Sequence, residues 1–401
     1  MTRLLLKFIL LCSIQGFAQK IAITNVSHYD GQQSVVKNSI ILINGRWIEK
    51  ILPSGNRTPD GYEIIDGRGY FLFPGLIDCH THIDNMGAAQ RALYSGVTTV
   101  RTAGVDAYQD VSLAALSASG KISGPDVIAA GVYVTPNPGE TILADPRLGD
   151  FITGVESEES LRKMVRINID RGAKVIKTRG TERAGLPETD PRKQVYTEQQ
   201  LRAVVDEASK SGIPVMVHAH GDEGANAAVK AGARSIEHGT FLSKETLELM
   251  KSKGTFLVPT FITLEDLTKP GGDYQGPTLE LRGKFMMPAA EKVFKTAIEL
   301  GVKIATGADS DYSDKSTSRI SLECEHFVRM GMRPYQAIQS ATTLSAELLG
   351  LEAKTGKIQP GFEADLILLP GNPLEEIRNL QDILMVISNG KIALQRIPFG
   401  K

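Results

Sequence analysis

The chain has 401 residues, of which 42% are hydrophobic and 23% are charged, a balance that is ordinary for a folded globular protein. This length is too great for one small core and suits one large domain with an accessory domain. The 45 Lys and Arg residues nearly balance the 46 Asp and Glu residues, so the net charge is -1. The charge therefore offers no electrostatic argument for binding nucleic acid or an anionic membrane surface.

The first 18 residues have the layout of a secretory signal peptide. A basic start at Arg3 precedes an apolar run, and the small residues Gly16 and Ala18 suit cleavage after Ala18. We therefore expect residues 1–18 to be removed and the protein to be exported, into a periplasm or to the outside. A buried N-terminal strand is the alternative interpretation. No later segment is long and apolar enough to span a membrane.

Both ends of the chain are rich in short strand-forming segments. These segments are residues 20–26, 39–43, 62–65 and 69–73 near the start, and 365–369 and 383–387 near the end. The Asn-Gly pairs at 44–45 and 389–390 are typical of hairpin turns. We therefore expect residues 19–72 and 351–401 to form one small β-sandwich domain from both chain ends.

Residues 73–350 alternate between short apolar runs and amphipathic helical stretches. The runs are 75–78, 97–100, 127–130, 174–177, 214–218, 234–238, 255–258 and 302–305, and the clearest helices are 158–170, 198–210 and 245–253. Thr197 and Gln200 suit a capping box at the start of one helix. Strand–helix alternation repeated eight times predicts an α/β fold, a (β/α)8 TIM barrel. A doubly wound open sheet is the main alternative on pattern alone.

The histidines follow these predicted strands. His80 and His82 come directly after the first run, where a spacing of two places both side chains on one face. His218 and His238 end two successive runs, one strand–helix unit apart. Because the carboxyl ends of barrel strands meet at one face, these four imidazoles are expected to converge there and chelate metal ions. Two surface histidines are the alternative for the first pair.

Three further residues fit the same face. Asp309 follows the eighth run, where a carboxylate can ligate a metal and accept a proton from water, or simply cap a helix. Lys177 ends the fourth run; facing inward, it should have a lowered pKa and could react with carbon dioxide to give a carbamate that bridges two metals. On spacing alone, a solvent-facing Lys177 is equally open. His220 shares the face of His218 and is expected to contact substrate.

The motifs that contain these residues resemble those of the amidohydrolase superfamily, in particular the imidazolonepropionase-like branch that includes Xaa-Pro dipeptidases. The matching segments are residues 73–82, 175–177, 218–221, 236–239, 306–309, 361–368 and 371–373. The resemblance implies two divalent metal ions, zinc above all. The implied ligands are His80, His82 and Asp309 for one ion and His218 and His238 for the other, with carboxylated Lys177 as the bridge.

One segment departs from the family pattern. Dipeptidase relatives often carry a Gly-Gly-His loop after the third strand, whereas residues 132–139 contain no histidine. This difference leaves the metal ligands unchanged and weakens the assignment of a dipeptide substrate. Arg179, two residues beyond Lys177, could pair with a substrate carboxylate, and a solvated loop arginine is the alternative. His28 and His326 fall outside the pattern and are expected to be structural.

These features predict a hydrolase that uses a metal-activated water on a small-molecule substrate. The expected reaction is hydrolysis of the amide bond of a dipeptide or an N-acyl amino acid, with Asp309 as the proton acceptor. Ring opening of a cyclic amide is an alternative within the same chemistry. A catalytically inactive barrel that only binds ligands is an alternative from a different class. We expect no nucleic-acid partner and no membrane span, and a homo-oligomer is compatible with the sequence.

Overall fold

The structure of this chain is a computed structural model that describes residues 19–269 and 276–398. The predicted signal peptide, residues 1–18, lies outside the described residues. Among the helices of these two ranges, none combines the length and the apolar character that a membrane crossing needs.

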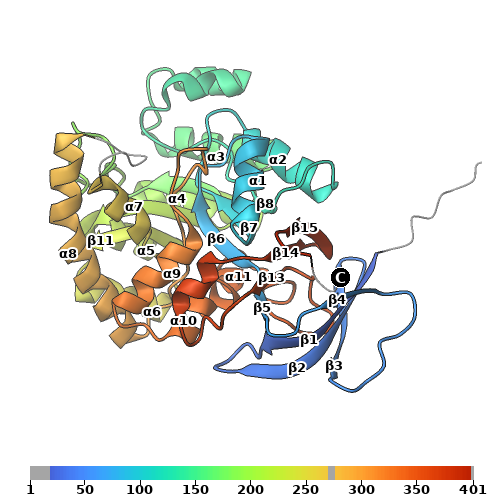
Figure 1. Cartoon of the computed structure of the whole chain (residues 1–401). Coiled ribbons are helices and arrows are strands. Elements are labelled where there is room, and N and C mark those ends of the chain that lie inside the picture. The colour runs from blue at the N-terminus through green and yellow to red at the C-terminus, as the bar shows by residue number, and fades with distance from the viewer. Residues whose placement is uncertain (1–18, 270–275, 399–401) are drawn as a thin grey trace, which may run out of the picture.

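The chain alternates between strands and helices along most of its length (Figure 1). The strands are β1 (Lys20–Tyr29), β2 (Val35–Asn44), β3 (Trp47–Pro53), β4 (Glu63–Asp66), β5 (Phe71–Pro74), β6 (Leu76–Thr81), β7 (Val97–Thr102), β8 (Asp126–Ile128), β9 (Ile176–Arg179), β10 (Val215–Gly221), β11 (Ser235–Phe241), β12 (Phe256–Val258), β13 (Leu366–Leu369), β14 (Met385–Ser388) and β15 (Lys391–Gln395). The α-helices are α1 (Met86–Tyr94), α2 (Gln109–Ala118), α3 (Glu158–Arg171), α4 (Glu198–Ser209), α5 (Asp222–Ala231), α6 (Lys244–Lys253), α7 (Phe261–Leu267), α8 (Pro277–Leu300), α9 (Ile320–Arg329), α10 (Pro334–Ser340) and α11 (Thr343–Leu349). Three short 3-10 helices complete the described chain: η1 (Gly139–Ala144), η2 (Pro146–Phe151) and η3 (Ile377–Gln381).

Strands from both ends of the chain form one mixed sheet. Its order is β15-β14-β13-β5-β1-β2-β3, and β4 pairs with β1 beside this path. The ends meet where β5 pairs antiparallel with β13, with Phe73 opposite Ile367. The predicted hairpin at 389–390 is confirmed, because Asn389 and Gly390 connect β14 to β15 with positive φ values of 51° and 72°. Figure 1 shows the blue N-terminal strands beside the red C-terminal ones.

The parallel strands form two shorter sheets, β6-β7-β8 and β12-β11-β10-β9. Hydrogen bonds continue between them: the amide of Val134 donates to the carbonyl of Lys177 at 2.9 Å, next to a parallel bridge between Val134 and Thr178. Helices α3 to α6 alternate with β9 to β12, and the predicted capping box of Thr197 and Gln200 starts α4. The chain is thus an α/β fold with parallel strand–helix units, as the sequence predicts.

The prediction of an eighth strand at residues 302–305 is wrong, because this segment does not form a regular strand. Only Ile304 forms a parallel bridge, with Leu257 of β12. The segment divides its hydrogen bonds between two neighbours: Ala305 donates to the carbonyl of Leu257 at 3.0 Å, and Cys79 of β6 donates to the carbonyl of Thr306 at 2.9 Å. A continuous ladder with one partner does not develop, although the segment still lies between β12 and β6.

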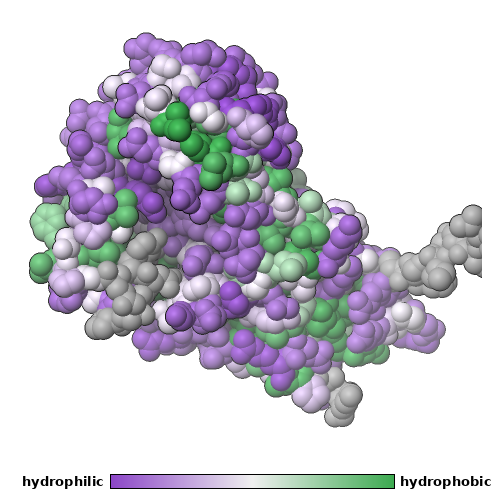
Figure 2. All heavy atoms as spheres, turned by 90° about the horizontal axis from the view of Figure 1, so that it is seen from above, coloured by the Kyte–Doolittle hydropathy of each residue, from purple (hydrophilic) through white to green (hydrophobic). Residues whose placement is uncertain are grey.

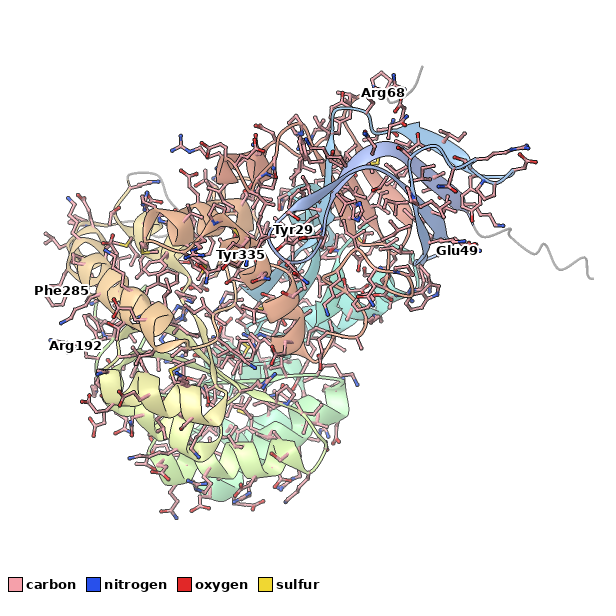
Figure 3. The ribbon with its side chains drawn as sticks, turned by 90° about the horizontal axis from the view of Figure 1, so that it is seen from below. Tyr29, Glu49, Arg68, Arg192, Phe285 and Tyr335 are labelled. Carbon is pink, nitrogen blue, oxygen red and sulfur yellow. The ribbon has the colours of Figure 1, made fainter. Side chains whose placement is uncertain are left out.

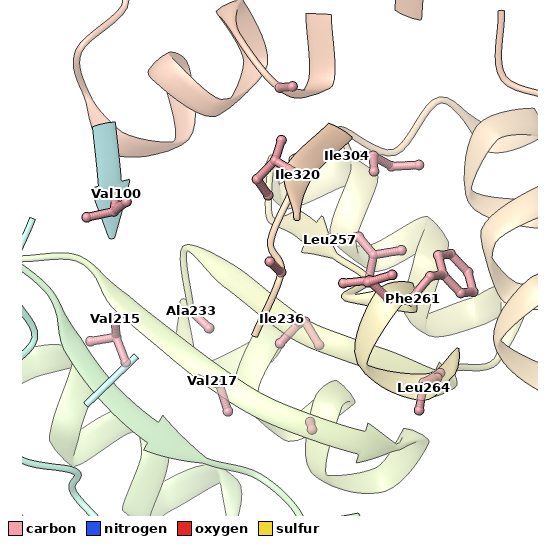
Figure 4. Packing of buried hydrophobic residues seen from close by; sticks show 14 of the residues in the cluster. Val100, Val215, Val217, Ala233, Ile236, Leu257, Phe261, Leu264, Ile304 and Ile320 are labelled. Carbon is pink, nitrogen blue, oxygen red and sulfur yellow. The ribbon is translucent and has the colours of Figure 1, made fainter. Parts of the chain in front are cut away.

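Aliphatic side chains from the parallel strands and their helices build the main core. Val215, Val217, Ile236 and Leu257 are each at most 2% exposed and pack in the same cluster as Phe261 of α7 (Figure 4). Burying such side chains removes apolar surface from water and is the main stabilising contribution of the fold. This core fixes the ends of the strands, and those ends carry the polar residues of the site.

Candidate metal centre and active site

The structure brings the predicted ligands together in two neighbouring groups. The groups are His80, His82 and Asp309 in the first, and His218, His220 and His238 in the second. Within each group, one potential ligand atom of every residue lies within 4.8 Å of the others. The ring centroids of His80 and His238 are 5.0 Å apart, so the two groups belong to one site.

Hydrogen bonds determine which ring nitrogen carries the proton in His80 and His82. Nδ1 of His82 donates to the carbonyl of Gly104 at 2.9 Å, and Nδ1 of His80 donates to Oε2 of Glu237 at 2.7 Å. A carbonyl or a carboxylate only accepts, so each Nδ1 carries a hydrogen. Nε2 of each ring is thus the nitrogen that faces the rest of the group, and a metal ion would bind it in its unprotonated form.

Asp309 adds a third electron-rich atom to the first group. Its Oδ1 lies 3.1 Å from Nε2 of His82 and 3.3 Å from Nε2 of His80. Burial opposes ionisation, but His80 and His82 hold the pKa of Asp309 well below its usual value, so the side chain is a carboxylate. Two imidazole nitrogens and a carboxylate oxygen this close together need a cation among them, either a shared proton or a metal ion. The donor set of two imidazoles and one carboxylate fits a divalent metal ion.

The second group offers neutral imidazoles. Burial, reinforced by the neighbouring histidines, lowers the pKa of both His218 and His238 well below the usual value. Nε2 of His218 donates to the carbonyl of Glu182 at 3.0 Å, which leaves Nδ1 of that ring free. Nδ1 of His238 lies 2.7 Å from the hydroxyl of Thr260, which holds the ring in place. Neutral, oriented rings of this kind are suited to metal binding.

His220, expected as a substrate contact, lies among the residues of the second group. Its ring stacks on that of His238 at 4.6 Å, and its Nδ1 lies 2.8 Å from the hydroxyl of Thr240. Burial lowers its pKa to about 3. The geometry therefore allows a role as ligand as well as the predicted contact with substrate.

Lys177 is enclosed beside the first group. It is 2% exposed, and its Nζ lies 3.3 Å from Nε2 of His80. Burial lowers the pKa of Lys177 to about 7, although the carboxylates of Glu237 and Asp309 act in the opposite direction. The solvent-facing alternative is excluded by this burial, which favours the neutral form of the amine.

A buried ion pair that the sequence analysis did not single out holds His80 in place. Glu237, which is fully buried, accepts from His80 through Oε2 and from Arg101 through Oε1 at 3.0 Å. Burial disfavours the Glu237 carboxylate, yet Arg101 lowers its pKa to about 2. Arg101 also donates to the carbonyl of Cys79 at 2.6 Å and to the hydroxyl of Ser235 at 3.0 Å. In the sequence, the only sign of this ion pair was that charged Glu237 lies inside a run expected to be apolar.

Asp78 is a second unpredicted support. Its Oδ1 accepts from the amides of His80 and Ala308 at 3.0 and 3.1 Å, and its Oδ2 accepts from the hydroxyl of Tyr312 at 2.8 Å. It therefore ties the end of β6 to the segment that carries Asp309. The backbone strengthens the same connection, since the amide of Asp309 donates to the carbonyl of His80 at 2.7 Å.

A cavity of about 250 Å³ opens over the two groups. Besides the ligands, its lining includes Tyr133, Arg179, Arg183 and Leu264. The guanidinium of Arg179 lies 4.8 Å from the centre of the Tyr133 ring. Within the described ranges, neither Arg179 nor Arg183 forms an ion pair. Figure 2 shows a hollow bordered mainly by hydrophilic residues on the upper face of the molecule. Two unpaired cations in a small cavity suit an anionic ligand.

The remaining predictions concern residues 132–139, His28 and His326. Within residues 132–139, which contain no histidine, Tyr133, Thr135 and Asn137 line the cavity. His28 lies in the mixed sheet with its Nδ1 2.9 Å from the hydroxyl of Ser39. His326 on α9 pairs with Glu265 at 2.6 Å. Neither belongs to the two ligand groups, in agreement with the structural roles expected for them.

Parallel strand–helix units with clustered imidazoles and carboxylates at one site are typical of α/β enzymes that hydrolyse small molecules. The model of the amidohydrolase family matches residues 71–393, more than half of the chain, and the chain belongs to this family. Its reaction class is therefore hydrolysis of a carbon–nitrogen bond.

Known relatives agree with the branch expected from the motifs. Ochratoxinase of Aspergillus niger is 31% identical over 352 residues, which cover 78% of this chain and 72% of that protein. Imidazolonepropionase of Pseudomonas aeruginosa is 25% identical over 389 residues, covering 84% of this chain and 88% of that protein. A crystal structure of a Xaa-Pro dipeptidase with methionine bound in its active site has a TM-score of 0.84 at 31% identity, covering 93% of this chain and 99% of that one.

Proposed function

We propose that this chain is an exported, metal-dependent amidohydrolase that cleaves the amide bond of a dipeptide or an N-acyl amino acid with an activated water. The observation that carries the proposal is the convergence of two oriented ligand groups and two unpaired arginines on one small cavity. Export rests on the signal-peptide pattern of residues 1–18.

We also propose how the two parallel sheets and the mixed sheet are arranged in domains. The hydrogen bonds from Val134 to Lys177 and from Cys79 to Thr306 favour a single closed (β/α)8 barrel built from the two parallel sheets. The mixed sheet then forms a composite β-sandwich domain from residues 19–72 and 351–401, with the barrel, residues 73–350, inserted between its halves.

We propose that two divalent ions bind here. Zinc is proposed because imidazole nitrogens and carboxylate oxygens are among its usual ligands. His80, His82 and Asp309 would hold one ion and His218 and His238 the other, and carboxylated Lys177 would contribute to both as the bridge that the family resemblance implies. Such ions, when bound, lower the pKa of water and polarise a carbonyl group. The carbamate forms when neutral Nζ of Lys177 bonds to the carbon of carbon dioxide and releases one amine proton.

The residues of this chain then divide the work of hydrolysis. Asp309, kept ionised by its histidine neighbours, accepts the proton of the attacking water and passes it to the leaving nitrogen. Arg179 binds the substrate carboxylate, and its guanidinium is held over the Tyr133 ring. His220, neutral at physiological pH, contacts the substrate beside the second group.

Ring opening of a cyclic amide is the second candidate, because the imidazolonepropionase relative extends over 84% of this chain. The arginines suit a free carboxylate, which dipeptides and N-acyl amino acids share. The inactive, ligand-binding alternative is disfavoured because both ligand groups are complete.

Asp309→Asn tests the proposal directly. We expect kcat on the best substrate of a dipeptide and N-acyl amino acid panel to fall by roughly 10² to 10⁴-fold, as removal of a general base does, while the melting temperature stays near that of the parent. Asp314→Asn, an exposed change in the same segment, is the matched control. Full activity in Asp309→Asn, or fewer than about one bound metal ion per active parent chain, would refute the proposal.

A further inference from the structure

The connection between β9 and α4 forms one wall of the cavity. Arg183, Ala184 and Gly185 from this loop line the space above the ligands. The base of the loop is closed by an antiparallel bridge between Thr181 and Gln194. Its tip has no such ladder, so other contacts must determine where Arg183 lies.

The hydroxyl of Thr189 supplies some of these contacts, since it donates to the carbonyls of Arg183 and Leu186, and one side chain on α8 supplies four more. The guanidinium of Arg282 donates from Nη1 to the carbonyls of Ala184 and Leu186, each at 2.6 Å. From Nη2 it donates to the carbonyls of Pro187 and Thr189, at 3.1 and 2.7 Å. In Figure 3, Phe285 on α8 and Arg192 from the same loop lie at one edge of the molecule. A single cation therefore gathers four backbone carbonyls from the loop tip.

The position of this loop also reaches the ligands. The carbonyl of Glu182 accepts from Nε2 of His218 at 3.0 Å, and the carboxylate of Glu182 accepts from the amide of Asp190 at 2.9 Å. The loop therefore carries both a support for the second ligand group and a cation of the cavity wall, Arg183.

We propose that Arg282 is a positioning residue for substrate specificity: by clamping residues 184–189, it holds Arg183 at the cavity for a substrate carboxylate. The clamp is specific to arginine because a planar guanidinium presents five donors in a fixed fork. A lysine ammonium has three donors on one atom and cannot reach all four carbonyls in this arrangement. This inference rests on the proposed function, with Arg183 as a second carboxylate contact.

The test compares Arg282→Ala, Arg282→Lys and Arg183→Ala with Lys284→Ala as the matched control. Lys284 lies on the same helix and pairs only with Glu280 among the described residues. The substrates are N-acetyl amino acids, dipeptides and their C-terminal carboxamides. We expect Arg282→Ala and Arg183→Ala to raise KM for the carboxylates by about tenfold, with kcat within about threefold and the carboxamides little affected. Arg282→Lys should restore part of the loss.

Hydrogen exchange separates this inference from the proposed function. Amides of residues 183–190 should exchange faster in Arg282→Ala than in the parent and Lys284→Ala, whatever the substrate proves to be. Unchanged exchange would overturn the clamp. Faster exchange with unchanged KM for carboxylates, in a parent that hydrolyses them, would overturn its role in specificity. A parent that hydrolyses no member of the panel would instead overturn the proposed function.

Discussion

Glu237 matters because one carboxylate serves two buried partners. It holds the Nδ1 hydrogen of His80 and neutralises Arg101, which is itself 2% exposed. Glu237→Gln would replace one oxygen with an amide and leave a buried guanidinium without its counter-charge. Breaking a buried pair from one side destabilises a protein by about 3–5 kcal/mol, and loss of an orienting partner weakens metal affinity about 10- to 100-fold.

Chelator competition and urea unfolding of the Glu237→Gln variant measure these two effects. Glu207→Gln is the control, because Glu207 is 5% exposed and ion-paired on α4 but is not among the ligand groups. Metal affinity equal to that of the parent in Glu237→Gln would show that His80 needs no such orientation.

The sequence indicated the metal ligands but not the residues that orient them. His80, His82 and His218 were found because each follows a recognisable apolar run, and strand ends gather at one face. Glu237 and Arg101 also lie on strands, but their partners come from other strands far along the chain. No local pattern carries that pairing, so only the fold reveals it.

Among the elements, the segment that carries Asp309 packs closely against β6. A Cβ built on Gly307 would lie 2.7 Å from Cβ of His80 and 2.6 Å from Cγ1 of Val258. We expect Gly307→Ala to displace His80, to lower both activity and metal content, and to destabilise the fold by about 1–3 kcal/mol through overpacking.

Metal analysis, kcat and thermal melting of the Gly307→Ala variant check this expectation. Gly149→Ala is the control, since a Cβ there meets no atom within 4 Å. A Gly307→Ala protein with the parent's metal content and kcat would mean that the segment can move away from β6 without consequence.

The elements were predictable where local chemistry decides them. The capping box of Thr197 and Gln200 and the Asn389-Gly390 turn were predicted from residues that contact each other within a few positions. The strand expected at 302–305 was wrong because its hydrogen bonds are shared between β12 and β6, a division that an apolar run does not encode.

For the whole molecule, a partly buried polar cluster connects the mixed sheet to the parallel strands. Asp126 of β8 accepts from Asn389 at 3.0 Å and pairs with Lys354 at 3.4 Å. Asp365 lies beside this pair and accepts from the amide of Asn389 and the hydroxyl of Thr355. Burial raises the pKa of Asp365 to about 7, with the carboxylates of Asp126 and Glu363 acting in the same direction.

This raised pKa predicts how stability depends on pH. Between the unfolded pKa of about 3.9 and the folded value near 7, the folded chain binds the extra proton, so this group's contribution to stability falls as pH rises. The slope is at most about 1.4 kcal/mol per pH unit and levels off above pH 7. Asp365→Asn should remove it.

Urea unfolding from pH 5 to 8 measures the difference between Asp365→Asn and the parent. Up to about pH 7, the free energy of unfolding of the variant should rise relative to that of the parent. Above pH 7, the difference between the two should stay constant. Asp382→Asn, at an exposed position, should follow the parent throughout. A constant difference between Asp365→Asn and the parent across the range would contradict the raised pKa.

The pairing of β5 with β13 has a consequence for how the molecule is made. Residues 71–74 leave the ribosome long before their partners at 366–369, and all the parallel strands are synthesised in between. Until then β5 has an open edge, and an unpaired strand edge is a template for aggregation. A nascent chain that stalls before Leu366 therefore cannot finish its first sheet, however completely the parallel strands have folded.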